Sequence, residues 1–168
     1  VAVDESHRHR PGEPPQDRPV IRPAIRPAIR VGSGIDVHAF GPGDHVMLGG
    51  VRVPHGQGVV AHSDGDVILH ALCDALLGAA GLGDIGMHFP DSDPRWSGAP
   101  STDFLREALS RARQLGLRPV SAELVVIADA PKLAPHRAAL RAALSQLLDL
   151  PVERVNVKGK TTELGQTD

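Results

Sequence analysis

The sequence has little of several residue types that mark particular protein classes. It contains one cysteine, Cys73, so an internal disulfide is excluded and a reducing, cytoplasmic setting is expected. Tyrosine is absent and aromatic residues make up 2% of the chain, so we expect a core of leucine, valine, isoleucine and alanine. No apolar run approaches about 18 residues, the length that spans a membrane, so no membrane association is expected.

An excess of charge of one sign is also missing. The formal net charge is -2 over 168 residues, which gives no general electrostatic reason for binding nucleic acid or an anionic membrane. Glycine-rich loops of the Walker or dinucleotide-binding type are absent, and we find no internal repeat. The length suits one domain with a real hydrophobic core.

Residues 1–28 differ in composition from the rest of the chain. They are rich in proline and arginine and repeat the letters IRPA between residues 21 and 29. Such a segment buries too little apolar surface to form a core, so we interpret it as a disordered tail or a linker. Its local basic charge leaves a weak nucleic-acid contact open as the less favoured alternative. Residues 29–168 read as one domain.

Hydrophobic periodicity predicts an α/β domain, an α+β sandwich in which a mixed sheet in ferredoxin-like order carries helices on one face. A continuous apolar run at 124–127 predicts a strand buried on both faces. Residues 83–94 are rich in turn formers and are predicted to form a loop. Strands are expected at 29–38, 45–53 (turning at Gly49-Gly50), 120–128 and 155–158, and helices at 64–80, 102–115 and 135–148.

Three side chains suggest a metal site. Asp36 and His38 are two apart on an expected strand, so they point to the same side. On the first helix, Asp66, His70 and Asp74 are four apart and share a face. One aspartate and two histidines, Asp36, His38 and His70, are ligands of the kinds that zinc takes, and they leave a fourth position open as in catalytic sites. From spacing alone, an ordinary core histidine at position 70 remains the alternative.

The start of the first helix suggests an anion site. Ser63 is the expected N-cap, and Asp66 three residues later resembles a capping box. His62 and Ser63 would then lie beside unpaired backbone N–H groups of the first turn, which attract anions.

Two later segments carry polar groups with open interpretations. The loop at 83–94 holds three aspartates, Asp84, Asp91 and Asp93, which suit either a functional or a merely solvated loop. Residues 159–163 (GKTTE) follow a strand, and their hydroxyls, lysine and carboxylate suit phosphate and a divalent cation, or an exposed turn.

Taken in order, these motifs resemble the 2-C-methyl-D-erythritol 2,4-cyclodiphosphate synthase family. The matching segments are residues 34–40 (GIDVHAF), 61–66 (AHSDGD) through His70, 83–91 (GDIGMHFPD), 130–132 (APK) and 161–163 (TTE). The resemblance implies a cytoplasmic homotrimer with an active site between adjacent subunits. It implies a lyase of the non-mevalonate isoprenoid pathway that converts 4-diphosphocytidyl-2-C-methyl-D-erythritol 2-phosphate into the cyclic diphosphate and CMP.

The resemblance also implies roles for individual residues. Asp36, His38 and His70 would bind zinc, Glu163 would bind Mg²⁺ or Mn²⁺, and His62 and Thr161 would act on the phosphates. Residues 128–134 would come from the neighbouring subunit. The residues expected to line the substrate are Asp36, His38, His62, Ser63, Asp84, Gly86, Phe89, Asp91, Asp93, Ala128, Ala130, Pro131, Lys132, Leu133, Ala134, Lys160, Thr161, Thr162 and Glu163.

The sequence departs from the family pattern near its end. Glu163 is followed directly by Leu164-Gly165, and the family's Arg/Glu-containing segment and final strand have no counterpart. We therefore expect a C-terminally truncated domain that binds zinc, is poorly active and assembles weakly. The alternatives are a zinc-dependent phosphoesterase and an inactive metal-binding remnant or scaffold.

Overall fold

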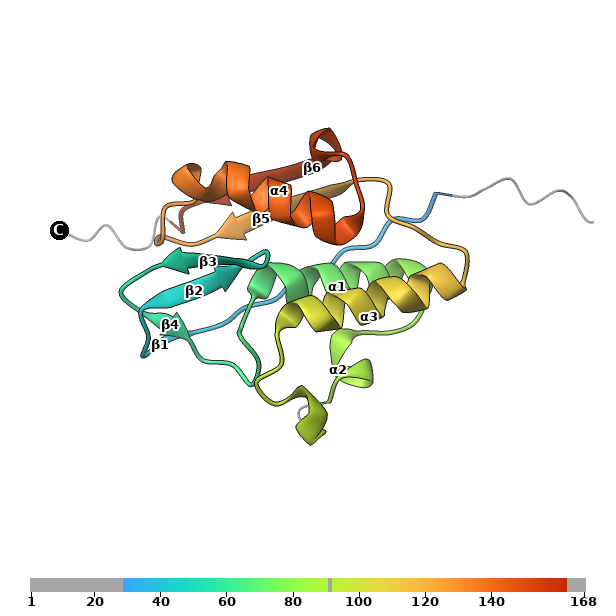
Figure 1. The fold of residues 1–168 in the computed structure, drawn as a ribbon, viewed down its shortest axis with the longest axis horizontal. Coiled ribbons are helices and arrows are strands. Elements are labelled where there is room, and N and C mark those ends of the chain that lie inside the picture. Colours follow the sequence, from blue (N-terminus) through green and yellow to red (C-terminus); the bar gives the residue numbers. More distant parts are fainter. Residues whose placement is uncertain (1–28, 91, 163–168) are drawn as a thin grey trace, which may run out of the picture.

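The computed structural model describes residues 29–90 and 92–162, which form a mixed α/β domain as the sequence predicts (Figure 1). The tail predicted at 1–28, Asp91 and Glu163 lie outside the described residues. Helix α4 lies against strands β5 and β6, and helices α1 and α3 pack side by side next to the β2–β3 hairpin. No helix among the described residues is long and apolar enough to cross a membrane.

The first strands are short and antiparallel. Strand β2 (His45–Leu48) pairs with β3 (Val51–Pro54), and β1 (Phe40–Gly41) pairs with β4 (Gly58–Val59). The hairpin turns at the predicted glycines, Gly49 and Gly50, whose φ angles are +57° and +80°. A two-residue turn with both φ angles positive matches the twist of a hairpin, and glycine adopts it without steric cost.

Helices α1 (Val67–Ala80) and α3 (Ser101–Gln114) form the centre of the core. The helix predicted at 102–115 is found, and its apolar residues pack into the core on one face. Helix α1 ends at Gly81, which takes the left-handed conformation with φ +73°. The buried core residues of the two helices are Ile68, Leu69, Leu72, Cys73, Leu77, Ala80, Phe104, Leu105, Ala108, Leu109 and Ala112.

The last part of the domain is a parallel strand pair covered by a helix. Strand β5 (Ala122–Ile127) pairs in parallel with β6 (Val155–Lys160), and α4 (Arg137–Leu148) connects them. The prediction that residues 124–127 are buried on both faces is wrong. Leu124 is buried, but Val125 and Ile127 are 51% and 66% exposed, because α4 covers one face and no described element covers the other.

The loop predicted at 83–94 contains short helices instead. Helix α2 (Ile85–His88) and the 3₁₀ turn η1 (Pro94–Trp96) each begin after an aspartate. Asp84 Oδ1 accepts the Met87 N–H at 2.9 Å, and Asp93 Oδ1 accepts the Arg95 N–H at 3.0 Å. These side chains cap the turns, which is why a segment rich in turn formers becomes helical here. Two further 3₁₀ turns, η2 (Ala134–His136) and η3 (Val152–Arg154), flank α4.

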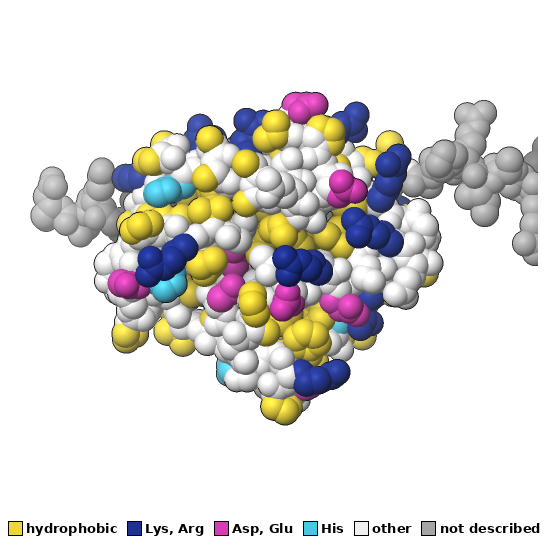
Figure 2. All heavy atoms as spheres, viewed as in Figure 1, with side chains coloured by type: hydrophobic (Ala, Val, Ile, Leu, Met, Phe, Trp, Pro, Cys, Tyr) yellow, Lys and Arg dark blue, Asp and Glu magenta, His cyan; other side chains and the backbone are white. Residues whose placement is uncertain are grey.

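Charged side chains of both signs are mixed on the surface (Figure 2), and some of them form ion pairs. On the face in Figure 2, positive and negative side chains are interspersed among hydrophobic ones. Ion pairs join Arg106 to Asp103 at 2.7 Å and Arg111 to Glu107 at 2.9 Å along α3. Exposed pairs of this kind contribute little to stability.

Candidate functional site

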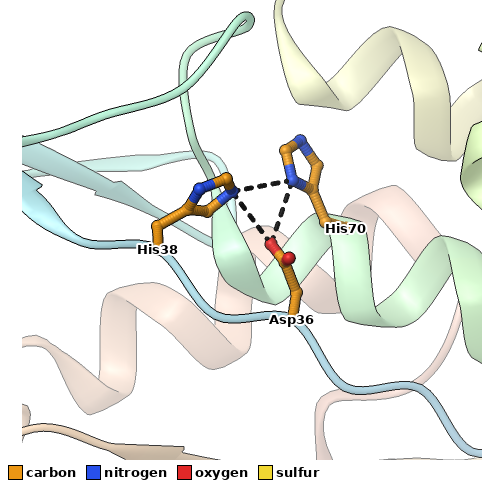
Figure 3. Close-up of side chains that lie close together, drawn as sticks. All are labelled: Asp36, His38 and His70. Atoms are coloured by element: carbon orange, nitrogen blue, oxygen red, sulfur yellow. Dashed lines mark hydrogen bonds and ion pairs between the residues drawn. The ribbon is translucent and has the colours of Figure 1, made fainter. Parts of the chain in front are cut away.

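Asp36, His38 and His70 converge on one point, as the sequence predicts (Figure 3). Asp36 Oδ2 lies 3.0 Å from His70 Nδ1 and 3.1 Å from His38 Nε2, and the two nitrogens are 3.3 Å apart. Ligand atoms on a tetrahedral zinc ion are separated by about 3.3 Å, as follows from bonds of about 2.0 Å. The three donors therefore fit a zinc ion with little movement.

The first two ligands come from an extended segment rather than from the strand predicted at 29–38. That prediction is wrong, because the segment lies along α1 instead of pairing with another described strand. A Cβ atom on Gly32 would come within 1.9 Å of the Ala75 carbonyl oxygen, and one on Gly34 within 2.0 Å of the Ala71 oxygen. Glycine at these two positions therefore permits backbone to approach the helix directly.

The spacing of these contacts places the ligands. Two residues of extended chain advance about 6.7 Å and four residues of helix advance about 6 Å, so each second residue meets a successive turn. Gly32 meets α1 at Ala75 and Gly34 meets it one turn earlier at Ala71; Asp36, two residues further along, contacts the side chain of His70, which is next to Ala71 in the helix. The expected alternation is confirmed, since Asp36 and His38 are partly buried while Ile35 and Val37 are 84% and 83% exposed.

Local interactions prepare Asp36 and His38 for a cation. Burial of Asp36 opposes its ionisation, but the hydrogen bond with His70 and the nearby His38 outweigh burial and lower the pKa of this carboxyl. His38 Nδ1 lies 3.1 Å from the Val60 carbonyl oxygen, which can only accept, so Nδ1 carries the proton. The lone pair of His38 Nε2 therefore faces Asp36 and His70, as metal coordination requires.

A cavity of about 280 Å³ opens beside the two histidines. It brings together six of the residues predicted for the site: His38, His62, Ser63, His70, Gly86 and Phe89. Asp84 and Asp93 do not line it, since they cap α2 and η1, and Asp93 also binds Arg95. An aromatic wall of Phe89, Trp96 and Phe104 closes one side, with ring centroids 4.9 to 5.4 Å apart.

The predicted anion site at the start of α1 needs correction. The N-cap is Asp66, not Ser63, and α1 begins at Val67. Asp66 Oδ1 accepts the backbone N–H groups of Ile68 and Leu69, each at 3.1 Å, so these first-turn donors are occupied. His62 and Ser63 still line the cavity beside the histidines.

Asp66 also joins the helix to the hairpin. Its two oxygens accept the N–H groups of Gly49 at 2.8 Å and Gly50 at 2.7 Å, and the residue is 0% exposed. Burial raises the pKa of this carboxyl despite these hydrogen bonds. Although Asp66, His70 and Asp74 are four apart in sequence, their side chains have separate partners: Asp66 binds the hairpin and Asp74 accepts the Ile85 N–H at 2.8 Å.

A second group of predicted residues gathers at the carboxyl ends of β5 and β6. The Ala128 N–H donates to the Lys160 carbonyl oxygen at 2.9 Å, which extends the parallel pairing. Asp129 accepts the Thr162 N–H at 2.9 Å and the Thr162 hydroxyl. Lys132 and Thr161 are exposed nearby in sequence, and no residue of 122–162 lines the cavity beside the histidines.

Comparison with known proteins identifies the group to which this geometry belongs. The YgbB family model matches residues 29–167. The chain belongs to the YgbB family. It is 57% identical over 133 residues to the 2-C-methyl-D-erythritol 2,4-cyclodiphosphate synthase of Xanthomonas axonopodis pv. citri, covering 79% of this chain and 80% of that protein. The resemblance drawn from the motifs is thereby confirmed.

Solved structures extend the YgbB assignment to the fold. A 2C-methyl-D-erythritol-2,4-cyclodiphosphate synthase structure matches with a TM-score of 0.78 and 51% identity, over 81% of this chain and 91% of that one. A CDP-bound structure of a synthase of the same name matches with a TM-score of 0.77 and 48% identity, with the same coverage. The mixed α/β prediction is confirmed by both.

Sequence reasoning missed several residues near the YgbB site. Trp96 lines the cavity, and its only signal was that it is the one tryptophan of an aromatic-poor chain. Asp129, two residues after the end of β5, lies inside the predicted segment 128–134 but was not singled out, although functional side chains often follow strand ends. Ser101 is 0% exposed and its Oγ lies 2.8 Å from His70 Nε2, a contact between distant segments that no local pattern indicates.

Proposed function

We propose that this YgbB protein converts 4-diphosphocytidyl-2-C-methyl-D-erythritol 2-phosphate into 2-C-methyl-D-erythritol 2,4-cyclodiphosphate and CMP. The observation that carries the proposal is the Asp36–His38–His70 cluster, whose open side faces a cavity closed by an aromatic wall. The names of its relatives support the same lyase activity in isoprenoid biosynthesis.

The reaction requires no protein nucleophile. An oxygen of the substrate's 2-phosphate attacks the β-phosphorus, the bond between the β-phosphorus and the bridging oxygen breaks, and CMP leaves with the bonding electrons. The protein must therefore position the two phosphates and neutralise charge. Zinc held by Asp36, His38 and His70 would supply Lewis-acid stabilisation of a phosphate oxygen.

Within the cavity, this chain's own side chains orient the substrate. His62 and Ser63 would donate hydrogen bonds to phosphate oxygens, and Gly86 leaves room beside them. Phe89, Trp96 and Phe104 would exclude water, which would otherwise compete with the 2-phosphate for the β-phosphorus.

The second group would bind the cytidine half from an adjacent subunit. Residues 128–134, with Lys132, lie outside the cavity beside the histidines, so one chain does not bring both halves together. The CDP-bound relative supports a cytidine ligand for the fold. We infer a homotrimer in the cytoplasm, in which Lys132 and Lys160 neutralise phosphate, Thr161 steadies the transferred phosphoryl group, and Glu163 binds Mg²⁺ or Mn²⁺.

Product analysis tests the proposed reaction. The protein is incubated with the diphosphocytidyl substrate, zinc and magnesium, and the products are followed by ³¹P NMR and chromatography. The cyclic diphosphate and CMP should appear in equal amounts. A linear phosphate product would instead mean that water attacks, as in a zinc phosphoesterase, and absence of any turnover with zinc bound would indicate a metal-binding protein only.

A matched pair of measurements tests the two proposed metals separately. Elemental analysis should give one zinc per subunit, and a magnesium titration of activity should shift to higher concentration in Glu163→Gln while the zinc content stays unchanged. The reason is that hard cations prefer carboxylate oxygens. An unchanged magnesium titration would contradict the role of Glu163.

A further inference from the structure

Asp74 holds the start of α2 from the neighbouring helix α1. Its side chain is partly buried, and Oδ1 accepts the Ile85 backbone N–H at 2.8 Å. Ile85 is the first residue of α2, so its N–H has no acceptor within that helix. Asp74 supplies the acceptor, and the hydrogen bond joins two helices that lie next to each other in Figure 1.

The other side-chain hydrogen bonds of α2 are local. Asp84 Oδ1 accepts the Met87 N–H at 2.9 Å, and His88 Nε2 lies 2.8 Å from the Leu82 carbonyl oxygen. Partners so close in sequence can move together with α2. Within the part of the chain that the structure describes, the hydrogen bond to Asp74 is therefore the one that ties α2 to another helix.

Helix α2 carries one side of the cavity beside the histidines. Ile85, Gly86 and Phe89 line it together with His70. Phe89 follows the last residue of α2, is 5% exposed and is held by the rings of the aromatic wall. Gly86 lies at the other end, next to Ile85, where no ring fixes the backbone. The position of Gly86 in the cavity therefore depends on the contact between Ile85 and Asp74.

The spacing of side chains on α1 accounts for this arrangement. Four residues advance a helix by about 6 Å, so Asp66, His70 and Asp74 lie on successive turns. Asp66 holds the β2–β3 hairpin and Asp74 holds α2, while His70 between them contacts Asp36. A single helix thus sets the place of a proposed metal ligand and of the cavity wall opposite it.

We propose that Asp74 is a positioning residue, which fixes the start of α2 and thereby sets Gly86 at a constant distance from His70. The inference rests on the proposed function, in which this cavity takes the methylerythritol half of the substrate and residues 128–134 of an adjacent subunit take the cytidine half. Loss of the contact should weaken binding of the first half, leaving the second half and the metal unaffected.

Three variants separate the hydrogen bond from the charge. Asp74→Ala removes the acceptor, whereas Asp74→Asn keeps an amide oxygen that can accept the Ile85 N–H. Asp103→Ala is the matched control, because Asp103 is an exposed carboxylate of α3 that pairs with Arg106 and does not line the cavity. An effect found in Asp74→Ala alone reports the contact with Ile85.

The experiment compares two ligands of the zinc-loaded full chain by calorimetry. In Asp74→Ala, affinity for the cyclic diphosphate product should fall about three- to tenfold, while affinity for CDP stays within about twofold of wild type. Zinc content should not change, and KM for the diphosphocytidyl substrate should rise by a similar factor. Hydrogen exchange of the Ile85 amide should be faster in Asp74→Ala than in wild type and Asp74→Asn.

Each outcome decides a separate point. A folded Asp74→Ala that binds the cyclic diphosphate as tightly as wild type would overturn the proposal, as would equal losses for both ligands, which indicate a general loss of structure. If Asp74→Ala does not fold by circular dichroism, Asp74→Glu, which displaces the carboxylate by one methylene, decides the question by the same measurements. A wild type that binds neither ligand would overturn the proposed function and this inference with it.

Discussion

The two groups of predicted site residues differ in how firmly the chain holds them. Asp36, His38 and His70 are enclosed, with 24%, 19% and 12% of their side chains exposed, and each is hydrogen-bonded. The group at the ends of β5 and β6 is exposed, and Lys132 and Thr161 there do not line the cavity beside the histidines. A metal ion needs donor atoms that one chain holds in place. A group that binds half of a substrate can instead remain exposed until the surface of a neighbouring subunit closes over it.

Exposed hydrophobic side chains lie near both groups. Ile35 and Val37 alternate with Asp36 and His38, and Val125 and Ile127 lie on the uncovered face of β5. Contiguous exposed apolar surface is typical of an interface. In the proposed trimer, these faces would bring the exposed group of one subunit to the enclosed group of the next.

The largest expected effect comes from breaking the enclosed group. His70→Ala removes one of three proposed ligands, so zinc content should fall and the cyclase rate should drop about a hundredfold or more. Lys132→Ala is the matched variant in the exposed group, and it should lower the rate roughly tenfold to a hundredfold with zinc retained. Elemental analysis and the rate assay separate them; undiminished zinc in His70→Ala would refute the ligand assignment.

A second large effect should come from the scaffold of the enclosed group. Asp66→Ala removes the cap of α1 and leaves the buried N–H of Gly49 and its neighbour Gly50 without their acceptor. The free energy of unfolding should fall by about 2–4 kcal/mol, measured by urea denaturation. Asp64→Asn, in the adjacent loop, serves as the comparison and should cost less. Equal losses would mean that the buried cap is not what fixes the loop to the hairpin.

The helices and the hairpin turn of the domain could be predicted from the sequence, but the contacts between distant segments could not. Repeating leucines and alanines fix helices α1, α3 and α4, and the glycine pair fixes the β2–β3 turn. Ser63 and Asp66 are both good caps, however, and only the hairpin turn, 16 or 17 residues away, selects Asp66. Likewise, Gly32 and Gly34 read as part of a strand, because nothing local reveals that they lie against α1.

The candidate site divides in the same way. Asp36, His38 and His70 were predicted from their residue types and from local spacing. Residues two apart on an extended segment, or four apart on a helix, point to the same side, and this can be read from neighbouring positions in the sequence. The partners that orient them, Val60 and Ser101, come from other segments and carry no motif. Sequence thus identified the donor side chains, while the structure supplied the contacts that orient them.

Mixing the two defective variants sharpens the comparison further. If each site combines the enclosed group of one subunit with the exposed group of the next, His70→Ala and Lys132→Ala subunits can complement each other. In a closed trimer assembled at random from equal amounts, about a quarter of the sites would have both intact halves. Activity should therefore recover to about a quarter of wild type after joint refolding. Recovery no greater than the sum of the separate variants would place both groups in one subunit.

The smallest expected effect concerns the exposed group alone. Asp129→Asn weakens the link to Thr162 and should lower the rate about two- to fivefold, with zinc content unchanged. The side-chain and backbone hydrogen bonds of Thr162 lower the pKa of the Asp129 carboxyl. Because its pKa is lowered, the Asp129 carboxyl stays ionised at every pH above its ordinary pKa. The contact with Thr162 is lost only when the pH falls through the lowered pKa. The ratio of wild-type to Asp129→Asn rates should therefore stay constant between about pH 5 and 8. A ratio that changes within this window would mean that Asp129 titrates there and that its link to Thr162 does not hold the loop.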